Sequence, residues 1–345
     1  MCMKWRKLLV ICSAAVLIAA TASHLAGLWL GINTDPVLLL HYTPSGQSQA
    51  PANQTAPIVV EGSSLIFFGL NWDNISQTWG RPIEAVRVPS ASTCELEVLH
   101  SRMPKSDLLI LGVSKYDLNE HFICDYRADI VPVSHAVRSM LDSGVNWAFM
   151  KRALGQYPLF YLRKLFPTAG HSMTILVGFR TKIKVLFGKG AVPVKVEEKP
   201  ESNLHPAPPE ASTKIQDWDR GRTMRNLSLL RVSCQAKHAY DGPKHLAFET
   251  MLRRGVQDGK VAIVVLPVPP PYEEEFGTPE VNQRFEASLA AARRCAPEAV
   301  WIRLDKMPEL QSKNYYWDLV HLNVDGQKIA TEAFLKEMNA LNFLK

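Results

Sequence analysis

Five short apolar runs constrain the fold of this chain more than any other feature. They are rich in valine, isoleucine and leucine, and lie at 57–60, 84–88, 107–112, 260–267 and 299–304. Strands that are apolar without a break are typical of a sheet buried on both faces, which is usually parallel. Helical patterns fall between the runs, and alternation of strand and helix requires right-handed crossovers. We therefore predict an α/β fold, a three-layer α/β/α sandwich with a parallel sheet.

The helices are predicted from residues that favour helix ends. The segments are 92–103, 244–255, 279–296 and about 325–342. Ser92 and Glu95 have the spacing of a capping box, and Thr278 followed by Pro279 suits a helix start. The second segment is expected to end at Gly255, and Asn323 is expected to cap the last helix.

The N-terminus is predicted to be a membrane anchor. Basic residues occupy the segment 1–7, and the stretch 8–31 has no charged residue and is long enough to span a bilayer. The positive charge before it predicts a cytoplasmic N-terminus and an exported body. A cleaved signal peptide is the alternative, because Ala20-Thr21-Ala22 resembles a cleavage site. We expect one transmembrane helix at 8–31 in the inner or cytoplasmic membrane, a tether at 32–56 and a periplasmic or extracytoplasmic domain at 57–345.

Two unusual segments lie inside that domain. Between Ser143 and Val196 there are nine Lys and Arg residues and no Asp or Glu, with many aromatic residues among them. A nucleic-acid groove is excluded for an exported protein, and an ordinary solvated basic face would not explain the aromatic residues. We interpret 143–187 as a basic amphipathic segment that lies on the lipid bilayer surface. The stretch 188–215 is rich in Pro and Glu and is predicted to be an insertion.

The cysteines and histidines do not indicate a metal centre. Four cysteines lie in the exported part, Cys94, Cys124, Cys234 and Cys295, and they allow either two disulfides or buried free thiols. The chain has no CxxC motif and no HExxH motif. We predict no metal and no cofactor.

Three residues at the two ends of the domain predict nucleophilic catalysis. The sequence Gly62-Ser63-Ser64-Leu65 follows the first strand, and Asp318 and His321 lie three positions apart before the last helix. Ligand sites of parallel sheets lie beyond the carboxyl ends of the strands, which brings these segments to one edge. A serine needs a base to take its proton, and that His needs a carboxylate to fix its tautomer. We predict that Ser64 is the nucleophile, His321 the base and Asp318 its orienting partner.

The sequence resembles the SGNH (GDSL-type) hydrolase superfamily in these segments. GSSL stands where that family has its Gly-Asp-Ser-Leu block, and the Asp-x-x-His spacing matches its last block. The similarity is greater to membrane-anchored members, the DltD-type D-alanyl transfer proteins and the alginate O-acetylation proteins. It covers roughly 57–135 and 240–340 and depends on the order, the separation and the strand context of these motifs together.

The resemblance also implies an oxyanion hole, and here the chain departs from the family pattern. The backbone N–H of Ser64 is one expected donor. The family's second block supplies a Gly, where this chain has Ser90, and its third block supplies an Asn, where this chain offers Tyr116 or Ser114. Ser90 and Tyr116 are the substitutes we select.

The expected function is that of an extracytoplasmic serine O-acyltransferase or esterase. The resemblance implies an acyl-Ser64 intermediate, a cell-envelope polysaccharide or polymer as substrate, and a membrane-bound O-acyltransferase as partner. The alternative is a non-catalytic accessory protein of the same fold that binds the acyltransferase or a glycan. The departures in the middle blocks favour the accessory protein, whereas the intact Ser, His and Asp favour the enzyme.

Overall fold

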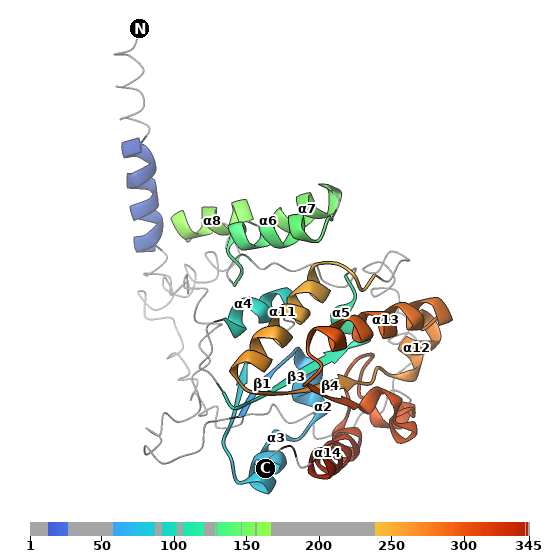
Figure 1. Ribbon diagram of the computed structural model, residues 1–345. Helices are drawn as coiled ribbons and strands as arrows, with labels where there is room; N and C mark the ends of the chain where they lie inside the picture. The colour runs from blue at the N-terminus through green and yellow to red at the C-terminus, as the bar shows by residue number, and fades with distance from the viewer. Residues whose placement is uncertain are drawn as a thin grey trace, which may run out of the picture. The chain divides into compact units, whose positions relative to one another are not determined.

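The computed structural model describes residues 13–26, 58–86, 92–101, 106–120, 128, 130–145, 147–155, 157–166, 239–341 and 343 (Figure 1). These residues belong to two compact units, each described by itself. One unit contains the helix at 13–26 and helix α8 (Tyr157–Leu165). The other contains the sheet and the remaining helices. The predicted tether at 32–56 and insertion at 188–215 lie outside the described residues.

The centre of the larger unit is a five-stranded parallel sheet. The strands are β1 (Ile58–Glu61), β2 (Ile83–Val86), β3 (Leu108–Ser114), β4 (Lys260–Leu266) and β5 (Val300–Arg303). Their order is β2-β1-β3-β4-β5, and every neighbouring pair is parallel. The predicted α/β class and parallel sheet are confirmed, and each strand lies within two residues of its apolar run.

The helices of the larger unit are separated along the chain by these strands. They are α2 (Ser64–Gly69), α3 (Trp72–Trp79), α4 (Thr93–His100), α5 (Lys115–Leu118), α6 (Val133–Asp142), α7 (Trp147–Leu154), α11 (Pro243–Asp258), α12 (Pro270–Phe276), α13 (Pro279–Cys295) and α14 (Val324–Ala340). Ser92 and Glu95 form the predicted capping box, and Thr278 and Asn323 cap α13 and α14 as predicted. Three short 3₁₀ turns, η3 (Leu304–Lys306), η4 (Pro308–Leu310) and η5 (Lys313–Tyr315), lead from β5 toward α14.

Gly255 does not end its helix, and that prediction was wrong. Helix α11 continues to Asp258, and Gly259 follows it. A Cβ atom at Gly255 would lie 2.8 Å from side-chain atoms of both Leu109 and Val261. The glycine is therefore needed because it lets α11 approach the sheet closely, not because it ends a helix.

Both faces of the sheet are covered by helices, as Figure 1 shows, an arrangement consistent with three α/β/α layers. One face packs against α2, α3 and α14. Its buried residues form a single core cluster: Ile58, Val60, Leu108, Ile110, Ala262, Val264, Ile302, Leu65, Ile66, Leu70, Trp72, Ile75, Ala330, Phe334 and Met338. The opposite face carries Leu109 and Val261, which contact α11. The two covered faces explain why the central strands β1, β3 and β4 are buried and apolar over most of their length.

The strand order fixes where a site can form. The chain leaves β1 toward β2 on one side and returns to β3 on the other, so β1 and β3 are neighbours at a reversal of the order. Connections leave in opposite directions at such a point and open a crevice beyond the carboxyl ends of the strands. Ser64 follows β1, and Ser114 ends β3.

The N-terminal segment is described only in part. Residues 13–26 are helical. In the described part of the chain, no helix combines the length and the apolar character needed to cross a membrane. Residues 8–12 and 27–31 of the predicted anchor lie outside that part, so the anchor stays a prediction.

Candidate active site

The turn between β1 and α2 presents two consecutive serines. Ser63 is the N-cap of α2, and its Oγ accepts a hydrogen bond from the backbone N–H of Leu65 at 3.2 Å. Ser64 is the first residue of the helix, where the backbone N–H has no acceptor within the helix itself. The two adjacent side chains therefore begin from different backbone positions and point to different partners.

Two glycines allow this turn to lie against the sheet. A Cβ atom at Gly62 would lie 2.6 Å from the side chain of Ile66, and one at Gly112 would lie 2.4 Å from it. Both distances are too short for real contacts, so a side chain at either position would push α2 away. The first turn of α2 therefore sits directly over β1 and β3, and this fixes the position of Ser64.

Ser64, His321 and Asp318 form a continuous chain of hydrogen bonds. Ser64 Oγ lies 2.8 Å from His321 Nε2. His321 Nδ1 lies 2.6 Å from Asp318 Oδ2. The side chains of His321 and Asp318 are 14% and 21% exposed, so the site is shielded but open to a substrate. The structure thus brings together all three residues that the sequence selected.

The loop that carries Asp318 and His321 is held by its own backbone. Asp318 Oδ1 accepts hydrogen bonds from the backbone N–H groups of Val320 at 2.8 Å and His321 at 2.7 Å. The backbone N–H of Trp317 donates to the carbonyl of His321 at 3.2 Å. An antiparallel bridge joins Tyr316 to Leu322 just outside this pair. The three-residue spacing is therefore one closed turn in which a single carboxylate binds both the backbone and the imidazole.

Buried polar contacts join this loop to the fold. The hydroxyl of Tyr316 donates to the carbonyl of Leu310 at 2.9 Å, and burial raises the pKa of that phenol above its ordinary value. Asn323 accepts a hydrogen bond from the N–H of Gly326 at 3.0 Å and donates to the carbonyl of Asn314 at 2.7 Å. Asn323 therefore caps α14 and also fixes the end of the loop that carries Asp318 and His321.

Aromatic rings surround the imidazole. The Trp317 ring is stacked on His321 with centroids 5.2 Å apart and an angle of 17° between the planes. Phe68 from α2 approaches His321 edge to face, at 5.1 Å and 74°. Phe68 also meets Trp317 at 5.9 Å. Sequence reasoning missed both rings, although the position of Trp317 in the same short loop as His321 was a usable signal.

A carboxylate behind the nucleophile engages the other serine. Burial raises the pKa of Asp117, and hydrogen bonds from Ser63 and Ser114 act in the opposite direction. Ser114 Oγ donates to Asp117 Oδ2 at 2.8 Å and accepts from the backbone N–H groups of Tyr116 and Asp117, each at 3.1 Å. A serine hydroxyl has one hydrogen, so Ser114 cannot also donate to an oxyanion.

The other two candidate oxyanion donors are Ser90 and Tyr116. Ser90 lies outside the described residues. Tyr116 is half-buried, and its ring meets Tyr272 of α12 edge to face with centroids 6.4 Å apart. Tyr116 thus contributes to packing beside the site.

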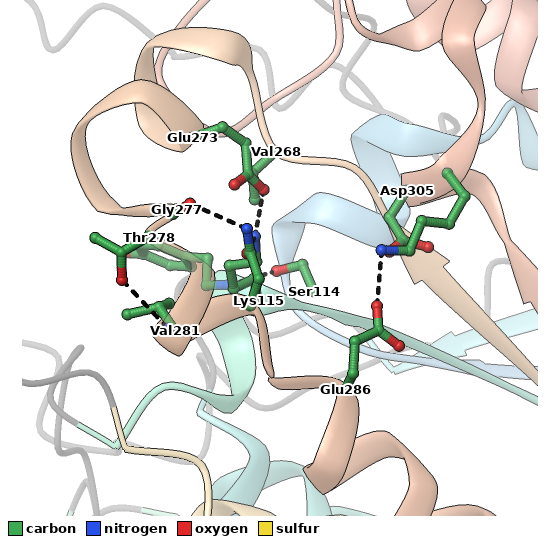
Figure 2. A network of polar contacts seen from close by, with 12 residues as sticks. Ser114, Lys115, Val268, Glu273, Gly277, Thr278, Val281, Glu286 and Asp305 are labelled. Carbon is green, nitrogen blue, oxygen red and sulfur yellow. Dashed lines mark hydrogen bonds and ion pairs between the residues drawn. The ribbon is translucent and has the colours of Figure 1, made fainter. Parts of the chain in front are cut away.

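A buried lysine fixes α12 beside the catalytic loop. Lys115 follows the end of β3, and its Nζ donates to Glu273 of α12 and to Asn282 of α13. Figure 2 shows the Lys115 and Glu273 side chains pointing toward one another. Helix α12 also contributes Tyr272 to an apolar cluster that includes Leu319, which lies between Asp318 and His321. Lys115 was not selected from the sequence, because its partners lie more than 150 residues away.

The predicted basic amphipathic segment is described in part. In the larger unit, Leu141 of α6 is 63% exposed and Trp147 of α7 is 72% exposed. In the smaller unit, Tyr161, Leu162 and Leu165 of α8 are also exposed. Residues 167–187 lie outside the described residues.

The structure describes some of the cysteines and possible metal ligands. Cys295 at the end of α13 is a free thiol, so a two-disulfide arrangement that uses it is not formed. Cys124 and Cys234 lie outside the described residues. Over the described ranges there is no group of three His, Cys, Asp or Glu side chains that could hold a metal ion.

Comparison with known proteins gives no family. No protein-family model matches the chain, and no curated protein matches it significantly.

Proposed function

We propose that this protein is an extracytoplasmic serine O-acyltransferase or esterase of the SGNH type that acts on a cell-envelope polysaccharide or polymer. The observation that carries the proposal is the unbroken path Ser64 Oγ to His321 Nε2, at 2.8 Å, and His321 Nδ1 to Asp318 Oδ2, at 2.6 Å. A nucleophile, a base and an orienting carboxylate in this order are the elements of acyl transfer through a covalent intermediate.

The reaction begins with formation of an acyl-enzyme. Ser64 Oγ attacks the carbonyl carbon of an acyl donor while its proton moves to His321 Nε2. Asp318 stabilises the resulting imidazolium through Nδ1 and holds the ring in orientation. The bond from the carbonyl carbon to the leaving group then breaks, and the leaving group takes the proton from Nε2. Ser64 now carries the acyl group, and His321 is neutral again.

The second half of the reaction uses the same base. A hydroxyl of the polymer, or a water molecule, gives its proton to His321 Nε2 and attacks the acyl-Ser64 carbonyl. The ester bond to Ser64 breaks, and Ser64 Oγ regains the proton from Nε2. A hydroxyl acceptor makes the protein a transferase, and water makes it an esterase.

Two groups beside Ser64 bear on how the oxyanion is stabilised. The backbone N–H of Ser64 is free of intrahelical bonding, whereas the Ser114 hydroxyl is engaged by Asp117. Loss of one oxyanion donor typically lowers the rate by about 10²- to 10³-fold. An acyl group delivered at high local concentration by a membrane-bound O-acyltransferase would offset a rate lowered in this way.

The exposed apolar residues support a site of action at the membrane. Trp147 is 72% exposed on α7, and Lys151 is exposed one helical turn later. Aromatic side chains at the acyl boundary combined with basic side chains at the phosphates favour binding at a bilayer surface. The proposed location is the inner or cytoplasmic membrane, with the catalytic domain on its outer side and the bilayer surface as a partner.

One observation favours the second candidate function, a non-catalytic accessory protein of this fold. Ser114, one of the two residues at the place of the family's third block, serves here as the cap of α5, and the other, Tyr116, packs against Tyr272. Without a second donor the site could bind an acyltransferase or a glycan and carry out no chemistry.

Active-site labelling separates these functions. The full-length protein in detergent is treated with a fluorophosphonate, which forms a covalent bond only with an activated serine. We expect labelling of the wild type and none of Ser64→Ala. The matched control is Ser63→Ala, which removes a hydroxyl at the next position and should keep labelling, with a stability loss of about 1 kcal/mol for the lost cap. A folded wild type that is not labelled would favour the accessory protein, and labelling of Ser64→Ala would exclude Ser64 as the nucleophile.

A further inference from the structure

The indole ring of Trp317 stacks directly on the imidazole ring of His321. The two rings are nearly parallel, at 17°, with centroids 5.2 Å apart. The backbone bond from Trp317 N–H to the His321 carbonyl holds the two residues opposite one another in the same closed turn. The indole therefore covers one face of the imidazole, while Asp318 and Ser64 bind its two nitrogens in the ring plane.

The face of an indole is the part of the side chain that attracts cations. The quadrupole of an aromatic ring places negative charge on its faces, and tryptophan gives the strongest cation–π interaction. His321 is neutral before attack and becomes a cation once it takes the Ser64 proton. A stacked indole stabilises the cation more than the neutral ring. Such contacts correspond to a factor of about 2 to 30 in an equilibrium constant.

We propose that Trp317 is a positioning residue that stabilises the imidazolium of His321 and so assists each proton transfer from an attacking hydroxyl. The inference rests on the proposed function, and it adds a residue to the machinery of the same site. Phe68 completes the arrangement. Its ring meets His321 at 74° and Trp317 at 71°, and its carbonyl accepts a hydrogen bond from Gln327 of α14 at 3.2 Å. Phe68 limits rotation of the imidazole away from the indole.

The polar and charged groups near His321 contact parts of its ring that the indole does not contact. Asp318 lies on the same loop and binds Nδ1, and Ser64 comes from α2 and binds Nε2. Asp117 of α5 reaches the adjacent Ser63. These groups lie along the edge of the imidazole or behind the nucleophile, so a change in the electron density of the indole alters only the contact at the ring face.

Fluorinated tryptophans separate charge stabilisation from packing. Successive fluorines withdraw electron density from the indole face and change its shape little. Tryptophan analogues with one, two and three fluorines are introduced site-specifically at position 317 of the full chain. The same analogues at Trp79 are the control, because this ring packs in the core against Phe334, with centroids 5.6 Å apart. Trp317→Phe and Trp317→Leu complete the series.

Two measurements are made on each protein in detergent. The first is turnover of p-nitrophenyl acetate as a function of pH. We expect kcat to fall stepwise with each fluorine at Trp317, by about 2- to 30-fold over the series, with KM little changed. The acidic limb of the pH profile should move to lower pH, because a less stabilised imidazolium forms less readily. Trp317→Phe should retain more activity than Trp317→Leu, and the Trp79 series should be flat.

The second measurement is an NMR titration of the His321 ring, assigned by comparison with His321→Gln. Its midpoint should fall with each fluorine at Trp317, and this readout needs no turnover. If the midpoint and kcat do not change along the series, the inference is wrong and the proposed function stands. If the midpoint falls while the wild type shows no turnover, the proposed function fails and the charge stabilisation by Trp317 stands.

Discussion

The Asp318→Asn substitution separates two tasks that one carboxylate performs. Oδ1 accepts the backbone N–H groups of Val320 and His321, at 2.8 and 2.7 Å, and Oδ2 faces His321 Nδ1 at 2.6 Å. Asparagine keeps one oxygen for the backbone donors and places an NH₂ group opposite Nδ1. That group can only donate, so the imidazole must carry its proton on Nε2. In this tautomer Nε2 cannot take the proton of Ser64.

The magnitudes follow from these contacts. The wrong tautomer is expected to lower kcat by about 10⁴. Stability should fall less in Asp318→Asn than in Asp318→Ala, because both backbone hydrogen bonds remain, now to a neutral oxygen. Asp318→Ala removes both, and hydrogen bonds to a charged group contribute about 1.5–3 kcal/mol each. The Asp318 side chain is 21% exposed, so water replaces part of this. We expect Asp318→Ala to lose about 2–3 kcal/mol in total.

The assay compares wild type, Asp318→Asn and Asp318→Ala. Turnover of p-nitrophenyl acetate gives kcat, and urea unfolding gives the free energy of unfolding. The reasoning requires Asp318→Asn to be nearly inactive and to lose less stability than Asp318→Ala, which should be the least stable of the three. If Asp318→Asn keeps kcat within tenfold of wild type, the tautomer of His321 does not control the reaction and the base has been wrongly assigned.

Three further predictions test other parts of the molecule. Burial raises the pKa of Glu120 to about 7 from its ordinary 4.5, so the free energy of unfolding should fall as pH rises between these values. The total fall between these pH values should be on the order of 3 kcal/mol at most, measured by urea unfolding. Glu120→Gln should remove this pH dependence, and an unchanged pH dependence in that variant would contradict the prediction. Lys115→Met should cost about 1–3 kcal/mol and lower kcat, because Glu273 loses its partner, whereas the surface control Lys306→Met should cost less than about 1 kcal/mol. Trp147→Ser should weaken co-sedimentation with anionic phosphatidylserine vesicles by roughly tenfold, and an equal loss in the exposed control Leu341→Ser would exclude a specific membrane face.

The sheet could be predicted because its signals are local. The central strands β1, β3 and β4 are buried over almost their whole length, so their apolar composition marks them. The caps of α4, α13 and α14 could be predicted because each capping side chain and the N–H that it binds are three residues apart. Gly255 was misread because a glycine that ends a helix and a glycine that allows close packing look alike in a sequence. Only the contact with Leu109 and Val261 distinguishes them.

The residues of the candidate site could be predicted from the sequence for a different reason. We selected Ser64, Asp318 and His321 from their positions in motifs that follow a strand or precede a helix. The parallel sheet then explains why the three residues meet. The residues that support them carry no such signal. Lys115 binds Glu273 and Asn282 across 158 and 167 residues, and no sequence spacing indicates those pairs. Long-range polar contacts of this kind follow from the packing of helices, which a pattern of residue types does not determine.

Two identical neighbours show where local reasoning stops. Ser63 and Ser64 have the same side chain, and the sequence favours Ser64 only by its place in a motif. The two serines differ in backbone conformation because the helix begins between them. Ser63 has an extended conformation as the cap of α2, and its hydroxyl is used by Leu65 N–H and Asp117. Ser64 begins the helix, and its hydroxyl meets His321, 257 residues further along the chain. Ser63 is thus bound by residues close to it in the fold's β1 and β3 ends, whereas Ser64 meets a histidine that the sheet brings to it from the far end of the chain. This difference in partners is why we propose Ser64, and not Ser63, as the nucleophile.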